Sequence, residues 1–520
     1  MNFQSARRFH SGLRFHRAEL WEVGMKKSGR IFGAIILGMA LMAGCGDEQA
    51  AVALNGQPVE LTGNGTEGNG QNGQGQGSQE QDGRTQGQSD SEQSGERIKL
   101  TLGVVMDSTS PTMQNLVEAY NAQSDKYYVE MAEYLPENYD NAIFEASEDR
   151  FRMDLATGKG TDIVLFGGLS ADELGYAGVV LDLNSFLYAE DKVGEEPSGE
   201  KYLLDILECA QTGDALYEIS PAFTLGFIVG DGSRLGMENG WTMEEMMESF
   251  ERNGRDGLAL AQGQGRTVER LVEASIEDYV DWDAGTADFC KEEFYRVLEF
   301  GKVTDSSEYI RPSRESATAG IHLASCEGLG TAADIQYFKW LFGDNAAVKG
   351  WPCSHGTGIT VGIQQYSMGI CSYSKCPEGA WDFLEFFVDA AWTEREFEIE
   401  GELIKKNFSN YFGGFPVNRQ LFEKMLAQSM VQQYYPDTGN PIPLLQGEGE
   451  IPDFYANTAE DVEKLRELIA LADRRYLPDQ SVICQIIGEE IGGYNAGVLT
   501  AEQTAQKIQN RVQLYLDEQK

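Results

Sequence analysis

The chain has 520 residues, of which 83 are acidic and 41 are basic, and its formal net charge is −42. Residues 1–44 hold seven Lys or Arg and two Asp or Glu, so this segment is +5 and the remaining 476 residues carry −47. A body this acidic lacks the basic face that nucleic-acid binding needs, and electrostatic adhesion to an anionic bilayer is also disfavoured. Hydrophobic residues make up 41% of the chain, which supports a large core and excludes bulk disorder.

The N-terminal segment has the pattern of an export signal. Basic residues at 26–30 precede an apolar run over 31–42, which is shorter than the roughly 20 residues of a transmembrane helix. We therefore expect 1–44 to be a signal peptide, with Met25 as the natural start.

Residues 41–45, Leu-Met-Ala-Gly-Cys, resemble a bacterial lipobox, in which the cysteine becomes the lipidated first residue. Met42 stands where that motif usually has Leu. We expect Cys45 to carry a lipid; the alternative is a plain signal peptide with an incidental cysteine. Residues 45–96 then form a flexible tether, because 62–96 hold ten Gly and eight Gln and no aliphatic or aromatic side chain. Such a tether spans roughly 40 Å on average.

The rest of the chain alternates strand and helix patterns. Strands are predicted over 97–106, 126–134 and 162–166, and Pro111 opens a helix between the first two. This alternation indicates an α/β fold with a mostly parallel sheet, in which ligands bind at the carboxyl ends of the strands.

Further helix starts are marked by their capping residues. Thr242 and Glu245 form a capping box, and so do Thr500 and Gln503. Pro377 opens a helix with an apolar stripe, and the last helix carries a second such stripe. The stripe residues are Trp381, Leu384, Phe387 and Val388 in the former, and Ala505, Ile508, Val512 and Leu516 in the latter.

Several segments, in order, give the body a family resemblance. One is Gly-Lys-Gly-Thr-Asp-Ile at 158–163, where Thr161 replaces a Pro; another is Gly-Trp-Thr-Met-Glu-Glu at 240–245. The others lie at 118–121, 178–183, 216–221, 350–352, 374–381 and 414–418. Together they resemble the family 1 extracellular solute-binding proteins of bacterial ABC importers, in the sugar-binding branch of Gram-positive bacteria.

The resemblance implies a type II periplasmic-binding-protein-like fold, with two α/β lobes, several chain crossings and a ligand cleft between the lobes. Crossings are expected near Pro221, Asp344 and Glu394. The first lobe would then be 97–221 plus 345–394, and the second 222–344 plus 395–520.

Candidate ligand-binding residues lie at strand ends and in loops that should face this cleft. Aromatic rings can stack on the apolar face of a sugar, while polar groups take its hydroxyls. The candidates are Asp107, Ser108, Phe166, Gly167, Phe223, Trp351, His355 and Tyr411.

Metal and catalytic patterns are weak. Seven cysteines besides Cys45 include no CxxC, so we expect free thiols and neither a zinc site nor a cofactor, with Cys371 and Cys376 the best local disulfide pair. Beyond the signal, the histidines are His322 and His355, and no Gly-x-Ser-x-Gly, P-loop or His-Glu-x-x-His motif occurs.

Two pairs of adjacent tyrosines could in principle bind iron. Tyr127 and Tyr128 would face opposite sides of a strand, whereas Tyr434 and Tyr435 could reach one ion.

The sequence thus favours a non-enzymatic receptor, lipid-anchored on the outer face of the cell membrane. It would capture a sugar, preferably an oligosaccharide, and deliver it to the permease subunits of an ABC transporter. Two alternatives stay open: a secreted glycan hydrolase that uses cleft carboxylates, and a binding protein for a cationic metabolite or a metal.

Overall fold

The computed structural model describes most of the chain from residue 97 onward. The described ranges are 97–105, 111–136, 139–167, 169–188, 201–254, 258–259, 266–282, 284–305, 313–319, 323–363, 366–399, 402–407, 413–476 and 482–518. The expected signal peptide, Cys45 and the tether lie outside these residues, as do Asp107, Ser108, His322 and Tyr411.

The first sheet has four strands in the order β11-β3-β1-β2. Strand β1 (Ile98–Val104) runs parallel to β2 (Tyr127–Glu133) and to β3 (Ile163–Leu165), while β11 (Met368–Ile370) is antiparallel to β3. The three strands predicted over 97–106, 126–134 and 162–166 are therefore confirmed, and so is the α/β class.

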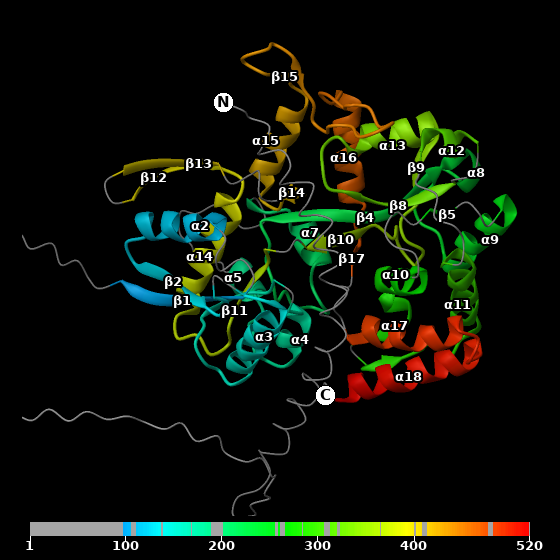
Figure 1. The fold of residues 1–520 in the computed structure, drawn as a ribbon, viewed down its shortest axis with the longest axis horizontal. Helices are drawn as coiled ribbons and strands as arrows, with labels where there is room; N and C mark the ends of the chain where they lie inside the picture. The colour runs from blue at the N-terminus through cyan, green and yellow to red at the C-terminus, as the bar shows by residue number, and fades with distance from the viewer. Residues whose placement is uncertain are drawn as a thin grey trace, which may run out of the picture. The chain divides into compact units, whose positions relative to one another are not determined.

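Helices cover both faces of this sheet (Figure 1). On one face, α2 (Pro111–Gln123) and α14 (Pro377–Ala390) contact the strands and each other. The apolar stripe predicted for α14 is buried, and Met113, Leu116 and Tyr120 of α2 are buried as well. On the other face lies α3 (Asn141–Ala156), whose Phe151 packs so closely on Gly103 of β1 that a Cβ there would meet the ring at 2.6 Å.

The second sheet has seven strands and is mixed, because most of them pair with one central strand. This strand, β4 (Ala222–Asp231), pairs antiparallel with four others: β8 (Ala324–Leu329), β9 (Ala346–Val348), β10 (Thr360–Ile363) and β14 (Phe415–Pro416). Parallel pairs add β5 (Leu258–Ala259) to β8 and β17 (Arg474–Arg475) to β10. The expectation of a mostly parallel sheet thus describes the first sheet and not the second.

Two helix groups pack around the second sheet. The first adjoins the sheet core and comprises α13 (Asp334–Phe342), α15 (Arg419–Ser429) and α16 (Ala459–Ala470). The second encloses a separate core and comprises α9 (Met243–Asn253), α10 (Thr267–Ala274), α11 (Glu292–Asp305), α17 (Val482–Asn495) and α18 (Ala501–Glu518). Helix α7 (Leu204–Cys209), which precedes the first passage of the chain between the sheets, also contacts β10. Both predicted capping boxes are confirmed, that of α9 and that of α18.

The remaining elements are short. The helices are α4 (Ala171–Tyr176), α5 (Asn184–Leu187), α8 (Gly232–Leu235), α12 (Arg314–Thr318), η2 (Ile276–Asp278) and η3 (Gly343–Asn345). Three hairpins pair β6 (Val280–Asp281) with β7 (Thr286–Ala287), β12 (Glu394–Ile399) with β13 (Glu402–Asn407), and β15 (Gln433–Tyr434) with β16 (Pro441–Ile442).

We call the four-stranded sheet with its helices the first lobe, and the seven-stranded sheet with its helices the second lobe. The chain leaves the first lobe at Pro221, just before β4. It returns between β10 and β11, not near Asp344, because β9 and β10 still pair with β4. It leaves again between β13 and β14, not near Glu394, because β12 lies against α2 of the first lobe.

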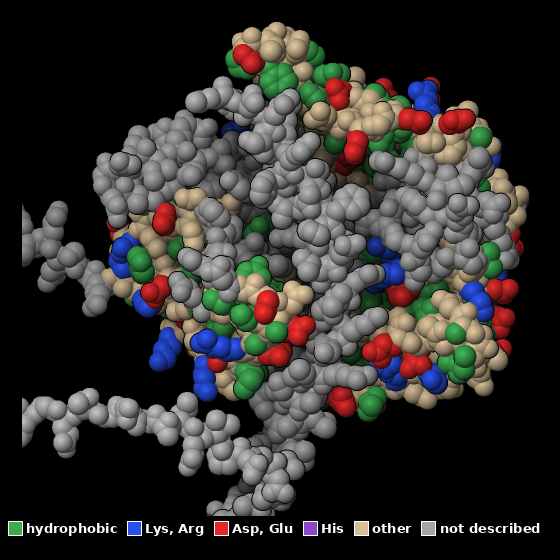
Figure 2. Space-filling view, viewed as in Figure 1, with side chains coloured by type: hydrophobic (Ala, Val, Ile, Leu, Met, Phe, Trp, Pro, Cys, Tyr) green, Lys and Arg blue, Asp and Glu red, His purple; other side chains and the backbone are tan. Residues whose placement is uncertain are grey.

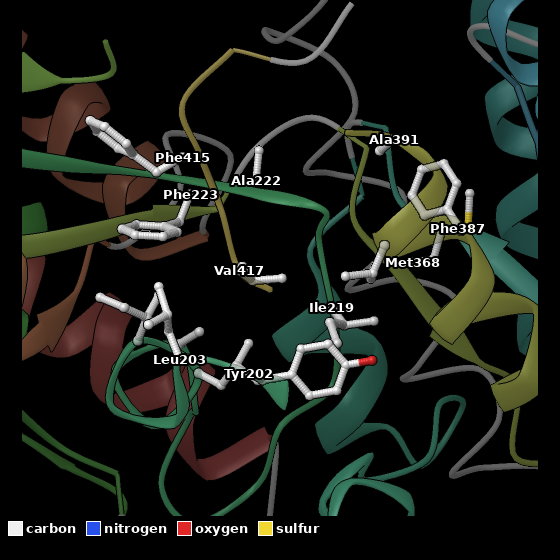
Figure 3. Packing of buried hydrophobic residues seen from close by; sticks show 14 of the residues in the cluster. Tyr202, Leu203, Ile219, Ala222, Phe223, Met368, Phe387, Ala391, Phe415 and Val417 are labelled. Carbon is white, nitrogen blue, oxygen red and sulfur yellow. The ribbon is translucent and has the colours of Figure 1, made fainter. Parts of the chain in front are cut away.

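Buried side chains fill the region where the chain first passes between the sheets (Figure 3). Phe223 at the start of β4 lies 5.8 Å, centroid to centroid, from Phe415 of β14. Ile219 precedes the passage and forms a bridge with Met368 of β11. One continuous core therefore joins the two sheets here.

Among the described cysteines, Cys209, Cys290, Cys353, Cys371 and Cys376 are free thiols. Cys353, Cys371 and Cys484 are buried, Cys209 and Cys376 are half-buried, and Cys290 is exposed. Cys371 lies 3.4 Å from the hydroxyl of Thr161, so its thiol has a hydrogen-bonding partner in place of Cys376.

Acidic and basic side chains are intermixed on the described surface that faces the viewer in Figure 2, with no continuous basic face there. Within the described ranges, no helix is both long enough and apolar enough to span a bilayer.

Candidate functional site

A cavity lies where side chains of the two lobes meet. Its first-lobe wall is built from α4, the Ser170 cap of that helix and residues 211–213 after α7. Its second-lobe wall is built from η2, Trp282, Arg475 of β17, the first turn of α17 and Tyr515 of α18. The cavity volume is about 70 Å³, and the cavity is partly open.

Local sequence explains how α4 comes to line this cavity. Strand β3 ends at Leu165, and the backbone turns through Gly167 at a φ of +58°, a conformation that favours glycine. Ser170 then accepts a hydrogen bond from the N–H of Glu173 and caps α4. The cavity therefore lies beyond the carboxyl end of a parallel strand, where the sequence predicts a ligand.

A buried ion cluster forms one side of the cavity and joins the lobes. Arg475 places one guanidinium nitrogen 2.6 Å from a carboxylate oxygen of Asp172, and its other terminal nitrogen donates to Glu218. The first nitrogen also donates to Thr212 at 2.9 Å, and Thr212 donates to Asp172 at 2.7 Å. The guanidinium is thus held by partners of the opposite lobe. Burial raises the pKa of Glu218, and the charge of Arg475 offsets part of that rise.

The carboxyl of Glu173 is a second buried group in the cavity wall. Burial is the main cause that raises its pKa to about 7, and the neighbouring Asp172 adds to the rise. The backbone N–H of Val482, at the start of α17, donates to this carboxyl across the lobes. Its Oε1 atom is buried and has no hydrogen-bond partner among the described residues.

Aromatic rings surround the mouth of the cavity. Tyr176 of α4 and Trp282 of the second lobe stack with centroids 6.1 Å apart and planes inclined by 20°. The ring of Tyr217 lies 6.3 Å from that of Tyr176, centroid to centroid, and Tyr515 also lines the cavity. Tyr176 keeps 38% of its surface exposed, so this ring is accessible to a ligand.

The combination of flat apolar faces, hydroxyl groups and carboxylates suits a ligand with both an apolar face and hydrogen-bond donors. The cavity volume of about 70 Å³ is small, because pockets for larger ligands measure about 300–1,000 Å³. A sugar ring inserted between Tyr176 and Trp282 would contact each at about 3.5–4 Å, so the two rings must separate to about 7–8 Å. A sugar ring can therefore bind here only if Tyr176 and Trp282 move apart.

The described candidates named from the sequence do not line this cavity. Phe166 and Trp351 are 4% and 3% exposed, and Phe223 is fully buried in the core of Figure 3. Phe166 packs on Gly369 of β11, and Trp351 packs near Tyr476 with centroids 6.2 Å apart. These rings present no free face to a ligand in this structure.

The other described candidates, Gly167 and His355, lie outside the lining of the cavity. Gly167 makes the turn that leads into α4. His355 is exposed in the loop after Trp351, where its ring nitrogen lies 3.4 Å from the Ser354 hydroxyl. Asp278 accepts hydrogen bonds from the Ser354 N–H and hydroxyl, so this carboxylate holds the serine and does not orient the histidine as a Ser-His-Asp triad requires.

Two further expectations concern metals. Tyr127 is buried while Tyr128 is 39% exposed, so this pair faces opposite sides as expected. Tyr434 and Tyr435 are both exposed, at the β15–β16 hairpin. Among the described residues, no group of three His, Cys, Asp or Glu side chains is placed to hold a metal ion.

Two kinds of cavity residue were not predicted from the sequence. Some follow the end of β3 by several positions, and others come from distant segments of the chain. Asp172, Glu173 and Tyr176 lie in the helix that follows β3, and an acidic pair with an aromatic one turn later was a usable local signal. Trp282 and Arg475 had no such signal, because nothing local links them to β3.

Comparison with known proteins gives structural similarities only. No family model matches the chain, and no curated protein matches it. The sugar-binding protein MalE from Xanthomonas citri is 13% identical, with a TM-score of 0.46 over 81% of this chain and 97% of that one. The cyclic alpha-maltosyl-1,6-maltose binding protein from Arthrobacter globiformis is 14% identical, with a TM-score of 0.43 over 81% and 99%. An extracellular solute-binding protein family 1 structure from Alicyclobacillus acidocaldarius is 13% identical, with a TM-score of 0.43 over 81% and 99%.

Proposed function

We propose that the chain is a family 1 extracellular solute-binding protein that captures a carbohydrate between its two lobes. The observation that carries this proposal is that the cavity wall comes from both lobes and places Tyr176 opposite Trp282. The ordered motif resemblance from 118–121 to 414–418 supports the same conclusion. The lobes would comprise about 97–221 with 366–407, and 222–363 with 413–520.

The mechanism is closure of the lobes around the ligand. A ligand that contacts Tyr176 on one lobe and Trp282 on the other binds the closed arrangement more tightly and so shifts the population toward it. The Asp172–Arg475 ion pair forms across the same boundary and would reform each time the lobes close. A micromolar dissociation constant, about −8 kcal/mol, suits a receptor that must release its ligand.

We also propose that this receptor is anchored at the membrane and serves a transporter. Cys45 would carry a lipid, and the tether over 45–96 would hold the receptor near the outer face of the membrane. Closed receptor would pass its ligand to ABC transporter permease subunits, and the protein would act by binding and not by catalysis. These assignments rest on the lipobox-like sequence and on the motif resemblance.

A thermal-shift screen of the purified protein against oligosaccharides, polyamines and metal salts tests the proposal. A ligand at 100 times its dissociation constant stabilises the folded state by about 2.7 kcal/mol, which gives a clear rise in Tm. We expect an oligosaccharide to raise Tm and to be recovered uncleaved by chromatography. Cleavage of the glycan, abolished by replacing a cavity carboxylate, would identify a hydrolase instead.

A further inference from the structure

The cavity contains more negative than positive charge. Asp172, Glu173 and Glu277 line it, and Arg475 is the only cation among the described lining residues. The guanidinium of Arg475 is already engaged by Asp172, Glu218, Thr212 and the carbonyl of Ala210. No cation from the described part of the wall therefore remains to pair with Glu173.

Glu173 lacks a donor for one oxygen. Val482 donates a backbone N–H to the Glu173 carboxyl. The Oε1 atom of Glu173 is buried and has no hydrogen-bond partner among the described residues. A buried acceptor without a donor costs free energy, and the cost is larger when the group is charged. Closing the lobes thus leaves a place for a hydrogen-bond donor, and a positively charged donor would also offset the excess negative charge.

We propose that the carbohydrate captured here carries a protonated amino group, and that this ammonium pairs with Glu173 while the sugar ring lies between Tyr176 and Trp282. This inference rests on the proposed carbohydrate-binding function. The cavity measures only about 70 Å³ and is partly open, so a compact ammonium group suits it better than a whole sugar ring does. The neighbouring aromatic faces also attract a cation.

The titration of Glu173 agrees with this assignment. Burial and Asp172 raise the pKa of its carboxyl to about 7 when the cavity is empty, and the N–H of Val482 and the charge of Arg152 offset only part of that rise. An ammonium at hydrogen-bond distance favours the carboxylate and would lower that pKa. Binding of the amino sugar near neutral pH would therefore release protons from the protein.

Isothermal titration calorimetry at pH 7 can distinguish a preference for an amino sugar from a preference for a neutral sugar or for an amine. It uses three matched tetrasaccharides and one amine. The probes are β-1,4-linked glucosamine tetrasaccharide, its N-acetylated form, cellotetraose and spermidine. We expect the glucosamine tetrasaccharide to bind about ten- to 100-fold more tightly than the two neutral glycans, as a charge-assisted hydrogen bond would give. Glu173→Gln should abolish this preference, whereas Glu450→Gln, at an exposed carboxylate outside the cavity, should keep it.

The N-acetylated probe keeps the test valid if Glu173→Gln does not fold, because acetylation removes the ammonium from the ligand and leaves the protein unchanged. Equal binding of all three tetrasaccharides, or a preference that survives Glu173→Gln, overturns the inference and leaves the carbohydrate receptor standing. Binding of spermidine alone overturns both the inference and the proposed function. Binding of the neutral glycans alone, or of no probe, also overturns the inference, and the broader sugar screen then decides the proposed function.

Discussion

At the scale of single residues, Trp282 and Trp351 occupy different environments in the fold. Trp282 is half-buried and stacks on Tyr176, whereas Trp351 is 3% exposed. We expect Trp282→Ala to weaken oligosaccharide binding about five- to 150-fold, because a large apolar contact of about 1–3 kcal/mol is lost. Trp351→Ala should instead lower the free energy of unfolding by about 3–5 kcal/mol.

Urea denaturation and ligand titration, applied to both variants, measure these effects. The two variants serve as controls for each other, since each removes an indole from a different environment. A Trp351→Ala protein of unchanged stability that binds sugar poorly would place the stacking surface at the candidate named from the sequence, and not at Trp282.

Glu173 gives a pH-dependent prediction at the same scale. Its pKa is about 7 in the folded state against an ordinary value of 4.5, so the folded state binds a proton more tightly than the unfolded state does. Stability is therefore lost as the pH rises from about 4.5 to about 7, by up to about 3 kcal/mol, and stays level above that range.

Glu173→Gln should remove this contribution and raise the free energy of unfolding at pH 8 relative to wild type. Urea melts of both proteins at pH 4.5 to 8 isolate the effect, because other titrating groups cancel in the difference. A difference between the two proteins that does not change with pH would show that Glu173 titrates normally.

At the scale of elements, the capping box of α9 offers a local test. The hydroxyl of Thr242 accepts the N–H of Glu245, and the Glu245 carboxylate accepts the N–H of Thr242 at 2.8 Å. Thr242→Ala should destabilise the protein by about 1 kcal/mol, because the first turn loses this cap.

The matched control is Thr318→Ala, in an exposed threonine near the end of α12 that caps no helix start. Its effect should stay within about 0.5 kcal/mol. Equal losses in both variants, measured by chemical denaturation, would argue against a special contribution from the cap.

Elements with strong local signals were predicted well. Pro111, Pro377 and the two capping boxes set helix starts, and the alternation in 97–106 set β1. Burial of Phe166 and Phe223 was not predictable in the same way. An aromatic at a strand end can face a cleft or a neighbouring strand, and only the pairing of β11 with β3 and of β14 with β4 decides which.

At the scale of the whole molecule, the testable feature is anchoring. Cys45 follows an apolar run and precedes a Gly- and Gln-rich segment, which motivates the proposed lipid. Cys45→Ser should move the protein from the membrane fraction to the soluble fraction, because the body carries a strong negative charge that disfavours adhesion to anionic lipid. Fractionation after a salt wash, with immunoblotting, measures the change, and Cys290→Ser at an exposed thiol of the body is the control. Membrane retention of Cys45→Ser equal to wild type would refute the anchor.

The sequence by itself determined the α/β class, the principal strands and the capped helices, because period, capping and turn preferences act between residues a few positions apart. It also indicated that a ligand site lies beyond the carboxyl end of β3. Only the tertiary structure decided which residues form the cavity. Its ion pair joins Asp172 to Arg475 across 303 positions, and its aromatic stack joins Tyr176 to Trp282. Such pairs arise from the packing of two lobes whose strands interleave along the chain, so no local pattern in the sequence specifies them.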